Sequence, residues 1–208
     1  GTPYEMGEKL GKIFKENNFY KNIIHHNTLD IENLAFNDRK FTYIVGNPPF
    51  VRKEVSEEAK NFTNNYQLEH LGNIHIAKDI IDGFQISQCF LLKIKEWSEL
   101  ETRFGFISNS SNFDYETEKF LKFFYSNYGI EKIYELSRVK DILFEKAKES
   151  VVAIVFNNNY QNNVIDYYTV DKGLFSEKPF ELLIIQEDKA IQIEQEKYSD
   201  AIVYLNKG

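Results

Sequence analysis

The chain has one cysteine, Cys89, four prolines and ten glycines among its 208 residues. A single cysteine excludes an internal disulfide and a metal site built from several cysteines. The low proline and glycine counts exclude collagen-like and linker-rich architectures. The sequence shows no signal peptide and no apolar run long enough to span a bilayer, so we expect a cytoplasmic protein without a membrane partner.

Hydrophobic residues make up 42% of the chain and aromatic residues 15%, which is enough for a packed core. The length allows one substantial domain with a short extension. The net charge of −7 is unfavourable for DNA binding, because phosphate contacts need clustered Lys and Arg. Either another part of the protein supplies most DNA contacts, or DNA is not the substrate. A local basic groove on an acidic domain is compatible with the same charge.

The hydrophobic pattern predicts an α/β fold with a largely parallel sheet. Helices are expected at 4–19, 74–100 and from Asp114 to about Tyr128, and a polar loop with at most one helical turn at 51–72. Strands are expected at 21–26, 41–45, 103–108, 130–136, 151–156 and 164–170, with weaker candidates at 180–186 and 202–205. The run 151–156 is the most apolar and should lie inside the sheet.

The tetrapeptide Asn47-Pro48-Pro49-Phe50 directly follows the strand predicted at 41–45. In open α/β sheets, ligands bind beyond the carboxyl ends of the strands. Methylation of an exocyclic amino group needs two hydrogen-bond acceptors aimed at its N–H bonds, since they stabilise the positive charge that develops on nitrogen. The Asn47 side chain and the Pro48 carbonyl can be these acceptors, and Phe50 can stack on a flat base. The alternative is a structural Asn-Pro turn with Phe50 in the core.

The segment from Phe41 to Arg52 resembles the catalytic motif of DNA adenine-N6 methyltransferases from type II restriction–modification systems. The segments 78–84, 103–109 and 141–156 are similar to later parts of the same catalytic domain. The resemblance implies a partial Rossmann-like methyltransferase domain with a mostly parallel sheet that ends in an antiparallel strand pair. It further implies S-adenosylmethionine as methyl donor, and contact of Phe50 and Phe144 with opposite sides of a flipped adenine.

The segment through which the family mainly binds its cofactor has no match in this sequence. No Gly-x-Gly turn precedes Asn47, and the family's Asp near the cofactor adenine corresponds to Asn27. We therefore expect a fragment that keeps two cofactor contacts, Asn27 and Asn47, and binds S-adenosylmethionine weakly or not at all by itself. Its expected partners are double-stranded DNA and the rest of the polypeptide, which would carry the cofactor-binding strands. Whether a nuclease domain is fused stays open.

The expected organisation is a catalytic part at 1–160 and an extension at 161–208 that leads toward a target-recognition domain. Arg52 and Lys53 are candidates for contacts to the DNA backbone, or solvated charges in a loop. Asn109 or Ser110, at a polar strand end, is a candidate for the base pocket. His25 and His26 alternate sides of a strand, and no ligand pattern surrounds the other histidines, so no metal site is expected.

Two other functions use the same features. Protein glutamine methyltransferases and some RNA base methyltransferases have a similar motif. A non-catalytic DNA-contacting subunit could also keep the fold. The Arg after the motif, the long polar segment 51–72 and the chain beyond Phe156 favour the DNA enzyme.

Overall fold

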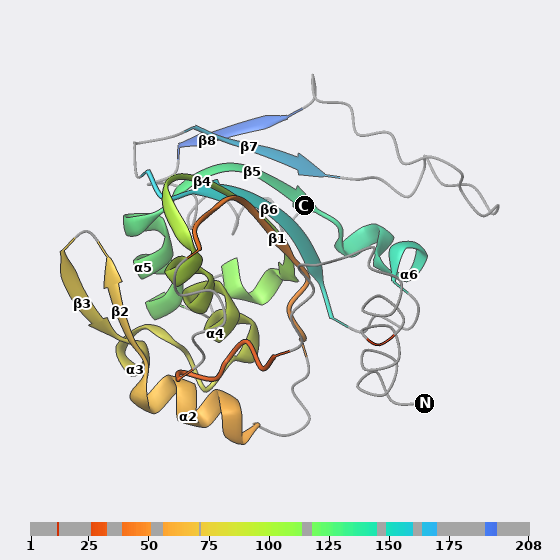
Figure 1. Cartoon of the computed structure of the whole chain (residues 1–208). Helices are drawn as coiled ribbons and strands as arrows, with labels where there is room; N and C mark the ends of the chain where they lie inside the picture. The colour runs from red at the N-terminus through yellow and green to blue at the C-terminus, as the bar shows by residue number, and fades with distance from the viewer. Residues whose placement is uncertain are drawn as a thin grey trace.

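The computed structural model describes residues 12, 26–32, 39–50, 56–70, 72–113, 118–144, 149–159, 164–169 and 190–194. Its largest element is a six-stranded sheet with helices gathered on one face (Figure 1). The strands are β1 (Phe41–Gly46), β4 (Ser98–Asn109), β5 (Gly129–Glu135), β6 (Val151–Asn157), β7 (Val164–Thr169) and β8 (Ile191–Glu194).

The strands lie side by side in the order β1-β4-β6-β5-β7-β8. Strands β1, β4, β5 and β7 run in one direction, while β6 and β8 run in the other. The sheet ends in the antiparallel pair of β7 and β8, and the α/β class expected from the sequence is confirmed. Strand β6 lies inside the sheet between β4 and β5, as its apolar sequence predicts. We call the side where β1, β4, β5 and β7 end the carboxyl edge.

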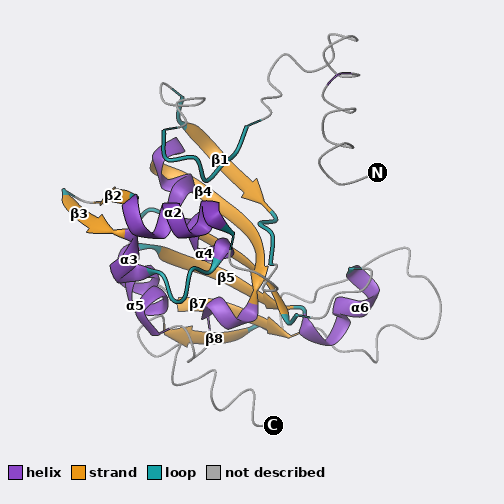
Figure 2. Cartoon of the chain, turned by 90° about the horizontal axis from the view of Figure 1, so that it is seen from below, coloured by secondary structure: helices purple, strands orange, loops and turns teal. Residues whose placement is uncertain are grey.

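Helices α2, α3, α4 and α5 pack together on one face of the sheet, and Figure 2 shows the same arrangement from below. Their bounds are α2 (Glu57–Asn65), α3 (Ala77–Ile80), α4 (Ile86–Lys93) and α5 (Glu118–Asn127). The short helix α6 (Lys140–Leu143) lies at the opposite end of the molecule from the two-stranded sheet of β2 (Gln67–His70) and β3 (Asn73–Ile76). Short 3-10 helices are η1 (Ile94–Trp97), η2 (Ser110–Phe113) and η4 (Ser137–Val139).

The core between the sheet and the helices is rich in aromatic rings. Phe104 and Phe156 stack across β4 and β6 with their centroids 4.6 Å apart. Phe124 from α5 packs edge-on against Phe156 and stacks on Tyr128. All four rings are buried. These contacts bury a large apolar area per residue and hold α5 against the centre of the sheet.

The polar segment 51–72 contains more regular structure than its sequence predicts. The expectation of a loop with at most one helical turn is wrong, because α2 is a nine-residue helix and β2 follows it. The Ser56 hydroxyl accepts a hydrogen bond from the Ala59 N–H at 3.1 Å and begins the helix. Two acidic residues occupy its first turn, and its buried side chains include Phe62. Capping and one apolar stripe outweigh the many polar residues.

The single helix predicted at 74–100 is also wrong. The segment begins as β3, continues through α3, α4 and η1, and enters β4 at Ser98. The break lies at Gly83 and Phe84, whose φ angles are +57° and +60°. A right-handed helix cannot contain such residues, and the sequence period does not reveal the break.

Several predicted elements lie wholly or mostly outside the described residues, namely 4–19, 21–26, 180–186 and 202–205, and so does the capping residue Asp114. Strand β8 was not predicted. No helix in the described part of the chain is long and apolar enough to cross a membrane.

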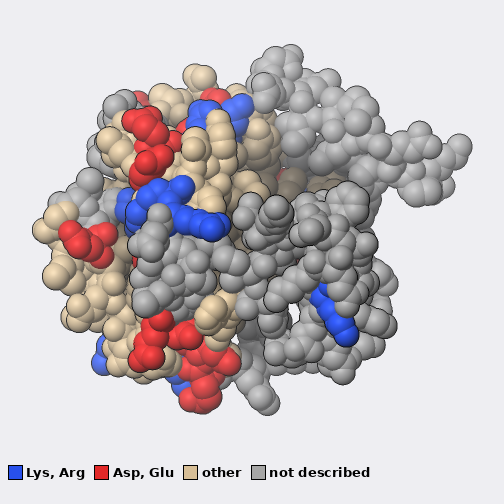
Figure 3. Space-filling view, viewed as in Figure 1, with Lys and Arg blue, Asp and Glu red and all other residues tan. Residues whose placement is uncertain are grey.

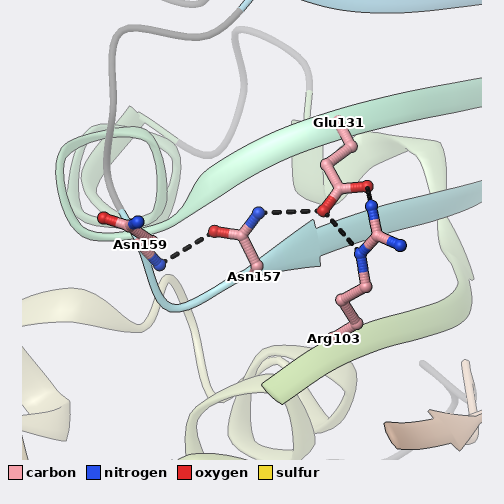
Figure 4. Close-up of polar contacts among 4 residues, drawn as sticks. All are labelled: Arg103, Glu131, Asn157 and Asn159. Atoms are coloured by element: carbon pink, nitrogen blue, oxygen red, sulfur yellow. Dashed lines mark hydrogen bonds and ion pairs between the residues drawn. The ribbon is translucent and has the colours of Figure 1, made fainter. Parts of the chain in front are cut away.

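A polar contact across three strands joins Arg103 on β4 with Glu131 on β5 (Figure 4). The Arg103 guanidinium donates two hydrogen bonds to the Glu131 carboxylate, at 3.1 and 2.7 Å. Asn157 on the intervening strand β6 donates to the same carboxylate at 2.9 Å. These bonds hold together the ends of the strands farthest from the carboxyl edge.

Candidate active site

Strand β1 delivers the Asn47–Phe50 tetrapeptide to the carboxyl edge. Gly46, the last residue of β1, pairs with Phe106 of the parallel strand β4. The Asn47 side chain is exposed, Pro48 is buried and Phe50 is half-buried. The motif therefore starts at a strand end with its second residue anchored in the protein and its first residue facing solvent.

Phe50 and Phe144 pack against the same small apolar cluster at this edge. Its buried members are Leu136, Val139 and Val151, and the half-buried residues packed around them are Phe50, Ile107, Tyr134, Leu143, Phe144 and Ala153. We call these residues the edge cluster. The two rings come from distant parts of the sequence, so the fold brings together the two aromatic residues that the resemblance pairs.

Backbone contacts fix the part of the edge cluster that carries Phe144. The Leu136 N–H donates to the Val151 carbonyl at 2.9 Å, and the Val151 N–H donates to the Ser137 hydroxyl at 3.1 Å. The Phe144 N–H donates to the Lys140 carbonyl at 2.7 Å and closes α6. The turn from β5 into α6 is thereby tied to the start of β6.

Asn109 ends β4 at the same edge and pairs with Val151 at the start of β6. Its side chain is 2% exposed, and its carboxamide oxygen accepts a hydrogen bond from the Ser111 hydroxyl at 2.6 Å. Alternation along the strand places Asn109 on the face of Ile107, which belongs to the edge cluster. The structure thus places Asn109 beside the cluster that contains Phe50 and Phe144.

Asn27 lies in a turn that is anchored to the main core by Leu29. Its carboxamide oxygen accepts a hydrogen bond from the Leu29 N–H at 3.1 Å, and its carbonyl accepts one from the Asp30 N–H. This oxygen therefore shapes the turn. No Gly-x-Gly turn occurs among the described residues, and the assignment of Asn27 and Asn47 as cofactor contacts stays a prediction.

Arg52 and Lys53 lie outside the described residues, so their prediction as DNA contacts stays untested. On the face seen in Figure 3, Lys and Arg side chains of the described residues lie among Asp and Glu side chains. They form no continuous basic surface in this view of the described part.

Two other kinds of chemistry have little support in the structure. Burial raises the pKa of the Cys89 thiol to about 11, and Sγ lies 3.7 Å from the Thr63 hydroxyl. A thiol that stays protonated is a poor nucleophile. Within the described ranges, no three His, Cys, Asp or Glu side chains gather as a metal site would require.

The sequence did not reveal a buried polar network behind the carboxyl edge. The Asn112 amide group donates to the hydroxyls of Ser87 and Ser108 at 2.8 and 2.9 Å. Gln88 donates to the Asn112 carboxamide oxygen at 3.3 Å. The polar run from Ser108 to Asn112 after an apolar strand is the signal that could have indicated it.

The sequence model of the Eco57I restriction-modification methylase family matches residues 5–144. Curated protein sequences gave no match. Solved structures with a similar fold include the type IIG restriction endonuclease BpuSI, at 16% identity and a TM-score of 0.58 over 85% of this chain. A type I restriction–modification complex matches 90% of the chain at 16% identity and a TM-score of 0.52. The methyltransferase subunit of a type I system from Streptococcus thermophilus matches 88% at 12% identity and a TM-score of 0.51.

At such low sequence identity, these structural similarities establish a shared fold and nothing more. The chain spans 35%, 21% and 35% of the type I complex chain, BpuSI and the Streptococcus subunit, respectively. The family match covers more than half of the chain and includes the Asn47–Phe50 motif, Phe144, and strands β1, β4 and β5. The chain belongs to the Eco57I restriction-modification methylase family.

Proposed function

We propose that the protein containing this chain transfers a methyl group from S-adenosylmethionine to the N6 amino group of adenine in duplex DNA, as part of a restriction–modification system. The single observation that carries this proposal is the placement of the Asn47–Phe50 motif and Phe144 at one edge of the sheet. Family membership supports the reaction class, and the motif chemistry supports an amino group as acceptor.

The chain's part in the reaction is to prepare the amino group. The Asn47 carboxamide oxygen and the Pro48 carbonyl accept hydrogen bonds from the two N–H bonds of the target. Because both acceptors are neutral and fixed, they stabilise the positive charge on nitrogen during attack without taking a proton first. Pro48 is buried, and Pro49 restricts the backbone that precedes it, which supports a fixed direction for the Pro48 carbonyl. When bound, the cofactor would supply an electrophilic methyl group to this nitrogen and leave as S-adenosylhomocysteine, and the nitrogen would then release one of its protons to water.

The edge cluster offers a place for a base that has left the duplex. The amino group of a stacked, paired adenine is out of reach, so the target base must be extruded. Phe50 and Phe144 are both half-buried and pack against the same apolar cluster, which is compatible with stacking on a base. We propose that they contact opposite sides of the extruded adenine. Asn109, at the end of β4, is proposed to hydrogen-bond the edge of this base, and Arg52 and Lys53 are proposed contacts to the DNA backbone.

The rest of the polypeptide has two proposed tasks. It supplies the cofactor-binding strands, because no Gly-x-Gly turn precedes Asn47 in this chain. It also supplies target recognition, with the boundary between the catalytic part and the extension near residue 160. We expect this chain alone to bind S-adenosylmethionine weakly or not at all, which calorimetric titration measures; low-micromolar affinity would contradict the proposed division.

The test uses the full-length protein and labelled S-adenosylmethionine. We expect label in duplex DNA with the wild-type protein and none with Asn47→Ala, while Asn61→Ala on the exposed surface of α2 transfers label at the wild-type rate. Label in protein or RNA instead of DNA would favour the glutamine or RNA base methyltransferase. No transfer to any acceptor, with DNA binding intact, would favour a non-catalytic DNA-contacting subunit.

A further inference from the structure

Four buried polar side chains lie between the amino end of α4 and the carboxyl end of β4. They are Ser87, Gln88, Ser108 and Asn112, and each is at most 2% exposed. Buried polar groups are unfavourable unless their hydrogen bonds are made. A network in which they are made holds the elements that it joins in one arrangement. Hydrogen bonds join these side chains into one network.

Asn112 connects the two elements. Its amide group donates to Ser87 at the start of α4 and to Ser108 near the end of β4. Its carboxamide oxygen accepts from Gln88, whose own carboxamide oxygen accepts from the Asp82 N–H at 2.9 Å. Asn112 thus links the end of β4 to the turn that contains Gly83 and Phe84, both with positive φ.

The end of β4 needs such support on one side. Pairing with β1 stops at Phe106, so Ser108 and Asn109 extend beyond the last residue that pairs with β1. On the other side, Asn109 pairs with Val151 of β6. The side chain of Ser108 points to the helix face, as those of Phe104 and Phe106 do, and that of Asn109 points to the opposite face. Holding Ser108 therefore fixes the direction of Asn109.

We propose that Asn112 is a positioning residue: its hydrogen bond to Ser108 holds the carboxyl end of β4 and thereby fixes Asn109 beside Phe50 and Phe144. Asn112 does not touch the substrate and acts through Asn109. The proposal rests on the proposed function for its kinetic consequence, whereas its structural consequence is independent of that function.

The structural test is hydrogen exchange of the full-length protein, read in the peptide that covers 108–113. The Ser110 N–H donates to the Ser150 carbonyl at 3.0 Å and reports on the end of β4. We expect its exchange to become about tenfold faster or more in Asn112→Ala and Ser108→Ala. Ser87→Ala is the matched control, because it removes an equivalent hydrogen bond from the same Asn112 amide at similar burial. In this variant we expect the exchange rate of the Ser110 N–H to change less than about threefold. Equal acceleration in both serine variants, or none in either, would overturn the proposal.

The kinetic test uses methyl transfer by the same variants, assayed well below their melting temperatures. We expect kcat to fall about 10- to 100-fold in Asn112→Ala and Ser108→Ala with little change in KM for DNA, because small displacements of a positioned group reduce the rate more than binding. Asn112→Gln should not restore the rate, since its longer side chain cannot keep both distances. A loss of activity in all variants that follows only the loss in melting temperature would show a merely structural role. If the wild-type protein transfers no methyl group, the proposed function fails while the exchange result still decides the role of Asn112.

Discussion

A β-carbon on Gly46 would lie 2.6 Å from Cε1 of Phe106 in the neighbouring strand. Phe106 is 5% exposed and packs near Phe156, so its ring has little room to move. The absence of a side chain at Gly46 therefore lets β1 approach β4 directly before Asn47. The glycine sets the position from which the candidate catalytic motif starts.

Substitution of Gly46 by alanine should reduce both stability and activity. Either the Phe106 ring or the end of β1 must shift, and overpacking of this kind costs about 1–3 kcal/mol. Urea unfolding of this chain measures the stability change, and methyl transfer by the full-length protein measures the displacement of Asn47. Gly105 is the matched control, since its β-carbon would meet only Cγ1 of Val45 at 3.5 Å, an ordinary contact. Equal effects of Gly46→Ala and Gly105→Ala would contradict this role of Gly46.

Removal of the Phe144 ring should lower kcat/KM for DNA about 5- to 150-fold, which corresponds to the 1–3 kcal/mol that base–aromatic stacking contributes. Phe144→Tyr should keep most of the activity, because it retains the ring. Phe90→Ala removes a half-buried ring that packs against the main core, and it should lower the melting temperature without lowering activity at 25 °C. A Phe144→Ala variant with wild-type kcat/KM would show that this ring does not contact the base.

The exposed residues of β1 should make the isolated chain self-associate. Val45 is 81% exposed and Tyr43 is 70% exposed, and β1 is an edge strand of the described sheet. Apolar edge strands pair with other chains, and a lysine at the edge prevents it. In light scattering over a concentration series, Val45→Lys should lower the average mass toward the monomer. Ile74→Lys, on β3 and 71% exposed, should leave the association unchanged; a wild-type chain that is monomeric throughout would refute this expectation.

The stability of the chain should rise from pH 8 to pH 9 because of Lys95. Burial, with a smaller contribution from the charge of Lys40, lowers the pKa of Lys95 to about 8 from its ordinary 10.5. Between these values the unfolded chain binds more protons than the folded chain, so the free energy of unfolding increases with pH. The raised pKa of Cys89 acts in the opposite direction only above its ordinary value of 9.0. Urea unfolding from pH 7.5 to 9 should show the rise in the wild-type chain and a clearly smaller one in Lys95→Met.

Strands with continuous apolar or β-branched sequences were predictable because local pattern and burial agree in them. The segments at 41–45, 130–136 and 151–156 form strands whose ends lie within one residue of the expected bounds, and the segment at 103–108 lies inside β4, which begins five residues earlier at Ser98. The prediction of one helix at 74–100 was wrong because the apolar period of the sequence continues through a turn. The backbone conformation of that turn depends on tertiary contacts. Gly83 and Phe84 adopt positive φ where Gln88 and Asn112 support the turn.

The candidate site was predictable to a similar extent. The Asn47–Phe50 motif gives both its residue types and its place after a strand, and the resemblance pairs Phe50 with Phe144, which the structure places in one cluster. Long-range partners without a motif were not predictable. The hydrogen bonds of Asn112 to Ser87 and Ser108 join residues whose side chains carry no distinctive spacing, and only the packing of α4 on β4 brings them together.

The most direct measurement is nucleoside analysis of duplex DNA after incubation with the full-length protein and S-adenosylmethionine carrying a labelled methyl group. Digestion to nucleosides and mass spectrometry identify the methylated base and the position of the label. We expect labelled N6-methyladenine with the wild-type protein and none with Asn47→Ala. Label in cytosine, in protein or in RNA, or wild-type transfer by Asn47→Ala, would contradict the proposed function.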